Sequence, residues 1–241
     1  MFGELFNDER SARTEAYQQG LSQILEANGA STDFESISKK SCRSTSDGAD
    51  FIANHVYRPC PPPISAVGFK LLYGQARKSK SRSVWDALRQ DKQLRILHVV
   101  RTDLLASLVS LKTALYTSKW VAPAEGAPSL LEPSFHLDPI ECARYFRTLQ
   151  RQRAWVEQYF VDHPKATIRY EDDLVEDFSN TLRRTQEFVG SKALPVRQVV
   201  FKQSTLPIRE RIVNFGELES YFAASRYKDL FRSEARMLPG K

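Results

Sequence analysis

The pattern of hydrophobic and polar positions predicts strands where short apolar runs are bounded by polar residues. The clearest run is 94–100 (LRILHVV), whose near-continuous hydrophobicity is typical of a strand buried on both faces of a parallel sheet. The runs 66–72 and 166–170 are predicted to be further strands, and 199–202 is predicted to be a last extended piece. Each run has the length of one strand.

Longer segments with an apolar stripe are predicted to be helices. Asp138 and Pro139 form an N-cap followed by proline at the first helical position, and Gly190 ends the helix that precedes it. The predicted helices cover 8–28, 83–90, 103–118, 138–161, 178–189 and 215–231. Strands that alternate with such helices indicate βαβ units. We therefore expect an α/β fold with a mostly parallel sheet, in one domain over residues 1–241.

Arg101 follows the apolar run 94–100 directly and precedes the helix 103–118. Parallel sheets bind ligands at the carboxyl ends of their strands. An arginine at that edge, next to the backbone amides of a helix N-terminus, favours a phosphate. The sequence therefore indicates an anion site at Arg101.

The helix 103–118 has two different faces. An apolar stripe is expected to face the core, and it consists of Leu104, Leu108, Leu111 and Leu115. A second stripe is small and polar, and it consists of Asp103, Ser107, Ser110, Ala114 and Thr117. Small side chains permit close approach, and their spacing leaves open whether another helix or a ligand approaches this stripe.

Composition narrows the class of protein. Of the 241 residues, 41% are hydrophobic, and the net charge of +6 fits a small anionic ligand or an acidic surface but is too dispersed for nucleic acid. The three cysteines form no CxxC pair and the four histidines are scattered, so neither a disulfide framework nor a metal site is expected. No apolar stretch approaches the roughly 20 residues of a membrane-spanning helix, and the N-terminus lacks a signal-peptide pattern. We expect a cytoplasmic protein without stable membrane insertion, and its oligomeric state stays open.

Five segments carry a combined pattern: 3–7 (GELFN), 68–71 (GFKL), 98–112 (HVVRTDLLASLVSLK), 168–174 (IRYEDDL) and 202–218 (KQSTLPIRERIVNFGEL). In this order they resemble the acidic motif, the second-strand lysine segment, the 3′-phosphate-binding segment, the Tyr-Glu-Asp-Leu corner and the C-terminal segment of sulfotransferases. The closest type is the bacterial carbohydrate, trehalose-sulfotransferase-like group. Each segment is weak evidence alone, but together they span most of the chain.

The resemblance implies a P-loop-NTPase-like parallel sheet flanked by helices. It also implies the co-substrate 3′-phosphoadenosine 5′-phosphosulfate, a carbohydrate or glycolipid hydroxyl as acceptor, and no metal. Arg101 and Ser110 would hold the 3′-phosphate by this analogy, and Lys202, Arg209 and Arg211 would also bind the nucleotide. Alternatively, Arg209 and Arg211 are exposed charges on a helix.

The resemblance also implies catalytic roles. Glu4 would be the general base, and its alternative is a surface glutamate or a cap for the helix that begins near residue 8. Lys70 would contact the phosphosulfate or the substrate, and its alternative is a surface lysine. Glu171 and Asp172 are expected to be structural, capping the next helix and ordering the corner.

One feature of the family is expected to be absent from this chain. In the family, a first strand and a loop of the type Pro-Arg-Ser-Gly-Thr-Thr lie about one helix before the acidic motif, and the loop cradles the 5′-phosphosulfate. Here Met1 stands directly before the segment 2–4 (FGE). We therefore expect the P-loop strand to be missing and sulfotransferase activity to be reduced or absent. The alternative function is a non-catalytic relative that binds a nucleotide or a partner protein.

Overall fold

The computed structural model describes residues 2–4, 48–57, 64–77, 82–118, 120, 133–196 and 206–232. The chain divides into two compact units. Unit 1 comprises Met1–Ile96, Tyr159–Lys165 and Gln186–Lys192. Unit 2 comprises Leu97–Gln158, Ala166–Thr185 and Ala193–Lys241. The prediction of a single domain stays a prediction.

Unit 1 contains a two-stranded parallel sheet, formed by β1 (Phe2–Glu4) and β2 (Phe69–Lys70). The register pairs Phe2 with Phe69 and Glu4 with Lys70 at their Cα atoms. Between these pairs β1 advances by two residues and β2 by one, which is the count of a β-bulge. The predicted strand 66–72 is therefore present but shorter.

The helices of unit 1 enclose a small core. Helix α3 (Gly48–Phe51) continues into the π-helical turn η2 (Ile52–Val56), and α4 (Ser83–Gln90) packs against α3. The amide of Ala49 donates to Oγ of Ser83 at 3.2 Å. The buried hydrophobic residues here are Phe51, Ile52, Val56, Ala76, Val84, Trp85, Leu88 and Phe160. The predicted helix 83–90 is confirmed with these bounds.

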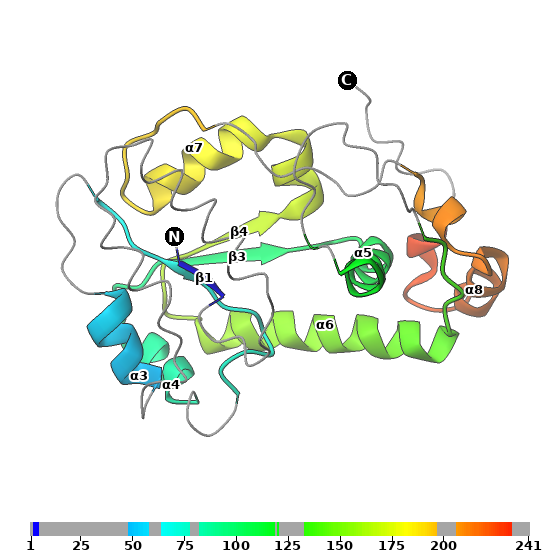
Figure 1. The fold of residues 1–241 in the computed structure, drawn as a ribbon, viewed down its shortest axis with the longest axis horizontal. Coiled ribbons are helices and arrows are strands. Elements are labelled where there is room, and N and C mark those ends of the chain that lie inside the picture. The colour runs from blue at the N-terminus through cyan, green and yellow to red at the C-terminus, as the bar shows by residue number, and fades with distance from the viewer. Residues whose placement is uncertain are drawn as a thin grey trace. The chain divides into compact units, whose positions relative to one another are not determined.

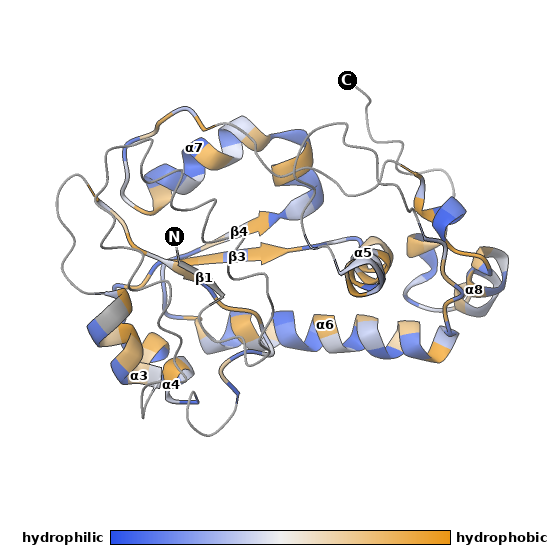
Figure 2. Ribbon diagram, viewed as in Figure 1, coloured by the Kyte–Doolittle hydropathy of each residue, from blue (hydrophilic) through white to orange (hydrophobic). Residues whose placement is uncertain are grey.

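Most residues of the paired strands β3 (Ile96–Val100) and β4 (Lys165–Arg169) belong to unit 2. Figure 1 shows the arrows of the two strands pointing the same way. Helix α5 (Leu104–Thr117) follows β3 after a short turn, and the π-helix η3 (Tyr170–Glu176) follows β4 directly. Both connections thus leave the same edge of the pair, where a ligand of a parallel sheet binds. Figure 2 shows both strands coloured as hydrophobic.

Helix caps confirm several predicted boundaries. Asp103 accepts a hydrogen bond from the amide of Ala106 at 2.8 Å, and α5 begins at the next residue after the cap. Asp138 accepts from the amide of Glu141 at 2.7 Å and starts the long helix α6 (Pro139–Tyr159). The remaining elements are α7 (Phe178–Phe188), the 3₁₀ turn η4 (Ile208–Arg211), α8 (Phe215–Phe222) and the 3₁₀ turn η5 (Lys228–Leu230).

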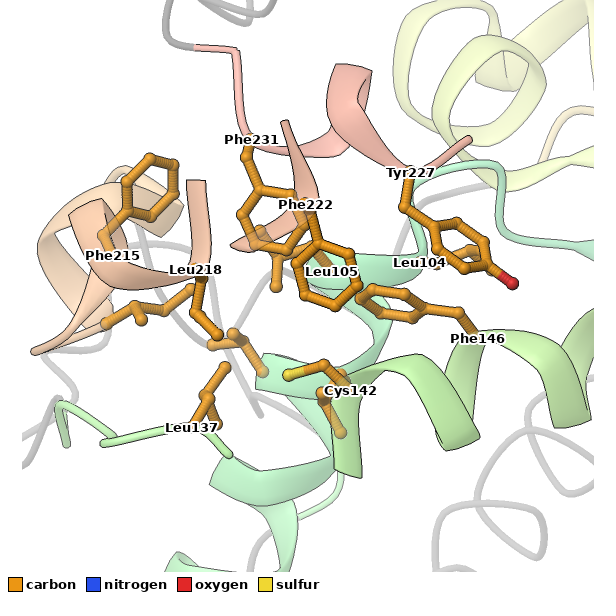
Figure 3. Packing of buried hydrophobic residues seen from close by; sticks show 13 residues of the cluster. Leu104, Leu105, Leu137, Cys142, Phe146, Phe215, Leu218, Phe222, Tyr227 and Phe231 are labelled. Atoms are coloured by element: carbon orange, nitrogen blue, oxygen red, sulfur yellow. The ribbon is translucent and has the colours of Figure 1, made fainter. Parts of the chain in front are cut away.

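The core of unit 2 joins α5, α6 and α8, as the close view of Figure 3 shows. Phe146 of α6 contacts the rings of Phe222 and Tyr227, with centroids 6.0 Å and 5.1 Å away. Phe222 stacks on Phe231 with centroids 4.8 Å apart and planes 4° from parallel. The buried members of this core are Leu104, Leu105, Leu108, Val109, Leu137, Cys142, Phe146, Ile212, Phe215, Leu218, Phe222, Tyr227 and Phe231.

Some expectations about these elements were wrong in detail. Val99 of β3 is 50% exposed, so the strand is not buried on both faces. In α5 the end of the apolar stripe leaves the core: Leu115 is 61% exposed, while Leu105 and Val109 are buried instead. The predicted helix 215–231 stops at Phe222, because the chain turns back to place Phe231 on the core.

The predicted helix 8–28 and the extended piece 199–202 lie outside the described residues. The described elements combine helices with small sheets of two strands. The expected P-loop-NTPase-like sheet therefore stays a prediction.

Candidate anion-binding site

Arg101 lies at the carboxyl end of β3, two residues before the N-cap of α5. Its side chain is 29% exposed. The β3–α5 turn therefore positions an arginine next to the first amides of a helix of 14 residues, as the sequence predicts. These amides and the guanidinium both favour an anion.

Three side chains hold Arg101 in place. Its Nε donates to Oε1 of Glu171 at 3.4 Å, and its guanidinium carbon lies 4.5 Å from the centroid of the Tyr170 ring. Arg153 of α6 donates to the main-chain carbonyl of Arg101. The guanidinium is thus fixed along one edge and over one face, and its backbone is fixed as well.

Glu171 is anchored mainly through Thr102. Its Oε2 accepts from the Thr102 amide at 2.7 Å and from the Thr102 hydroxyl at 2.9 Å. The carboxylate is only 13% exposed. The expectation that Glu171 orders the corner agrees with these contacts, and the segment it orders is the β3–α5 turn rather than the next helix.

The terminal nitrogens of Arg101 have no hydrogen-bond acceptor among the residues that the structure describes, since Nε alone is engaged. An arginine whose Nε is engaged and whose two terminal nitrogens stay available is suited to bind an oxyanion through two parallel hydrogen bonds. Among the described residues of unit 2, this arrangement is the strongest candidate for a binding site.

The small polar stripe of α5 has a mixed role. Ser107 Oγ lies 3.0 Å from the Tyr145 hydroxyl of α6, so this position serves helix packing. Ser110 is half-buried and makes no side-chain hydrogen bond with the rest of the described chain. The Thr117 hydroxyl donates to the Thr113 carbonyl at 2.8 Å. Of the stripe, Ser110 is the member whose hydroxyl is left for a ligand.

The two C-terminal arginines differ sharply. Arg211 is only 5% exposed and donates from Nη2 to Oγ1 of Thr113 at 2.5 Å, one turn of α5 beyond Ser110. Arg209 is exposed, and its guanidinium carbon lies 5.0 Å from the centroid of the Phe215 ring. The alternative that these arginines are exposed charges is thus wrong for Arg211. It agrees with the exposed side chain of Arg209.

The predicted catalytic residues lie in unit 1, where Glu4 and Lys70 are Cα partners in adjacent parallel strands. The backbone thus brings together two positions that are 66 residues apart in the sequence. Lys70 is exposed. Lys202 lies outside the described residues.

The described residues include neither a cluster of metal ligands nor a helix suited to cross a membrane. They contain no group of three or more His, Cys, Asp or Glu side chains arranged to hold a metal ion. Among them, no helix has both the length and the apolarity needed to cross a membrane.

The sequence predicts Glu171 as a structural residue of the corner, but it does not predict that Tyr170, Glu171 and Arg153 contact Arg101. Tyr170 and Glu171 follow a strand directly, and a polar pair at that edge was a usable signal, because neighbouring parallel strands end side by side. Arg153 gave no such signal, since it is one of several arginines on α6 and only the packing selects it.

Similarity to known proteins extends over much of the chain. Nodulation protein H of Rhizobium tropici is 27% identical over 187 residues, which are 76% of this chain and 72% of that protein. Nodulation protein H of Rhizobium meliloti is 29% identical over 140 residues, 57% of this chain and 56% of that protein. The latter alignment thus spans little more than half the length of the relative. No family model matches the sequence, and no solved structure matches it. The similarities support a sulfotransferase-like relationship, in agreement with the motifs.

Proposed function

We propose that this chain binds 3′-phosphoadenosine 5′-phosphosulfate. The proposal starts from the sulfotransferase-like relationship that its similarity to the Nodulation protein H proteins supports. We further propose transfer of the sulfuryl group to a hydroxyl of a carbohydrate or glycolipid. The fold that we propose is the P-loop-NTPase-like sheet flanked by helices. The observation that carries the proposal is the held guanidinium of Arg101 at the start of α5.

Arg101 would bind the 3′-phosphate through its two terminal nitrogens, next to the N-terminal amides of α5. Such charge-assisted hydrogen bonds are stronger than neutral ones, and the planar fork matches two phosphate oxygens. The hydroxyl of Ser110, on the next turns of the same helix, is a further donor. Arg211 contacts α5 through Thr113, one turn beyond Ser110, and it adds a buried positive charge next to that part of the helix.

The transfer itself forms a bond between the acceptor oxygen and sulfur and breaks the bond from sulfur to the bridging phosphate oxygen. The acceptor proton must leave, and the bridging oxygen gains negative charge, so the reaction needs a base and a cation. Glu4 is proposed as the base and Lys70 as the cation, and their pairing in adjacent strands supports a joint role. Adenosine 3′,5′-bisphosphate is the second product.

The test is transfer of labelled sulfate from the donor to sugar and glycolipid acceptors, combined with calorimetric binding of adenosine 3′,5′-bisphosphate. Binding together with turnover, even slow turnover, would support both the nucleotide site and the proposed transfer. Binding without turnover would identify a non-catalytic nucleotide-binding relative. Absence of both would overturn the proposal.

A further inference from the structure

We infer that Glu171 is a positioning residue that sets the direction in which Arg101 presents its two terminal nitrogens to a phosphate. The inference rests on the proposed function, because it concerns the arginine assigned there to the 3′-phosphate. It adds a role for a residue whose sequence motif indicated only a structural corner.

The contacts of Glu171 show how it is fixed. Its Oε2 accepts two short hydrogen bonds from Thr102, at 2.7 Å from the amide and 2.9 Å from the hydroxyl. Its Oε1 is left for Nε of Arg101, at 3.4 Å. The carboxylate is therefore anchored by the residue next to Arg101 and not by the Arg101 side chain, and it holds Nε in one position.

This anchoring selects one edge of the guanidinium for the ligand. Arginine binds oxyanions through two nitrogens, either the Nε edge or the terminal edge. Glu171 occupies Nε, so the terminal edge is the one offered. The Tyr170 ring, 4.5 Å from the guanidinium carbon, covers one face and limits rotation about the last side-chain bonds.

The arginine therefore has less conformational freedom to lose when it binds an anion. Ordering a long side chain costs free energy on binding, and a side chain ordered in advance avoids much of that cost. Arg153 contributes by holding the main-chain carbonyl of Arg101.

Glu171 also has an opposite effect, because its negative charge repels a phosphate bound at Arg101. Removal of the charge would relieve repulsion and strengthen binding, whereas removal of the positioning contact would weaken it. The two roles predict opposite signs, so an affinity measurement separates them.

The experiment compares two ligands of the full chain by calorimetry, adenosine 3′,5′-bisphosphate and adenosine 5′-monophosphate, in the wild type and in Glu171→Gln. A positioning role predicts that the preference for the bisphosphate falls by about fivefold or more, as expected for a weakened charge-assisted contact. An equal loss for both ligands would indicate a structural role alone and overturn the inference. A rise in the preference would show that repulsion dominates and would also overturn it.

Thr102→Val provides a second measurement that keeps every charge. It removes the hydroxyl that anchors Oε2 at 2.9 Å while Glu171 and Arg101 remain. The inference predicts a smaller loss of bisphosphate preference in the same direction, and an unchanged preference would contradict it. This variant also decides the matter if Glu171→Gln fails to fold.

Two further variants complete the design. Asp172→Asn removes one exposed negative charge on the same turn, and the bisphosphate preference should stay within about twofold of the wild type. In an Arg101→Ala background the effect of Glu171→Gln should vanish, since a positioning residue acts only through its partner. If the wild type itself does not bind the bisphosphate, the proposed function fails. If it binds and Glu171→Gln leaves the preference intact, only the present inference fails.

Discussion

Arg211 donates a hydrogen bond from Nη2 to Oγ1 of Thr113 at 2.5 Å, and the arginine is only 5% exposed. The Thr113 hydroxyl in turn donates to the Val109 carbonyl at 2.7 Å. The contact ties the turn η4 to the middle of α5, one helical turn from Ser110. A charged group at such a depth depends on its hydrogen-bond acceptors, because each donor that loses its acceptor costs a desolvation penalty.

Thr113→Val should therefore destabilise the protein by about 1–3 kcal/mol, the usual cost of depriving a buried donor of its acceptor. The substitution keeps the shape of the side chain and replaces the hydroxyl with a methyl group. The measurement is the urea midpoint at an unchanged slope. Thr113→Ser is the matched control, since it keeps the hydroxyl and should lose clearly less stability. Equal losses for Val and Ser would show that packing, rather than the hydrogen bond to Arg211, determines the effect.

Gly190 ends α7 with a φ of 79°, a left-handed conformation that favours glycine. A Cβ at this position would lie 2.8 Å from Nη1 of Arg95, which donates to the Phe188 carbonyl at 2.7 Å. Gly190→Ala should therefore cost about 1 kcal/mol or more in unfolding free energy. The control is Gly216→Ala on α8, where the new Cβ meets no atom within 4 Å and the helix favours alanine. The control should be neutral or stabilising, and the same loss in both variants would contradict the account of Gly190.

Burial raises the pKa of the Cys142 thiol from 9.0 to about 11, with a smaller contribution from the nearby charge of Glu141. Between these pH values the unfolded chain loses the proton and the folded chain keeps it, so the unfolded state is favoured as pH rises. We predict that the free energy of unfolding falls from about pH 9 to about pH 11, and that it falls less steeply in Cys142→Ala than in the wild type. Urea denaturation across this range tests it. An identical slope in the variant would remove Cys142 as the cause.

The sequence predicted the placement of Arg101 well, because local signals determine it. An apolar run, a cap at Asp103 and a helix pattern suffice to put the arginine at a strand end before a helix. The same holds for the start of α6 at Pro139, where capping chemistry is local. Neither boundary depends on the rest of the fold.

The partners of Arg101 could not be predicted in the same way. Glu171 is 70 positions away, and its selection depends on how β3 and β4 end side by side. The direction of the C-terminal arginines was also out of reach, since Arg211 is buried and Arg209 is exposed although they are two residues apart in one 3₁₀ turn. Tertiary packing decides both, and hydrophobic periodicity carries no information on it.

Arg101→Ala should weaken the binding of adenosine 3′,5′-bisphosphate by more than about 1.5 kcal/mol, roughly tenfold, the lower end for a charge-assisted contact. Arg101→Lys should recover only part of this loss, because an ammonium group keeps the charge but lacks the planar fork that Tyr170 and Glu171 hold. Calorimetry at constant ionic strength measures both variants.

The matched control is Arg144→Ala on α6, an exposed arginine whose guanidinium makes no hydrogen bond or ion pair with the described residues. It removes the same charge and should change the affinity by less than about twofold at physiological salt, because screening weakens distant surface charges. A loss in Arg144→Ala as large as that in Arg101→Ala would mean that net charge alone attracts the nucleotide. Full recovery by lysine would mean that orientation of the fork is unimportant, and it would remove the physical basis for a positioning role of Glu171.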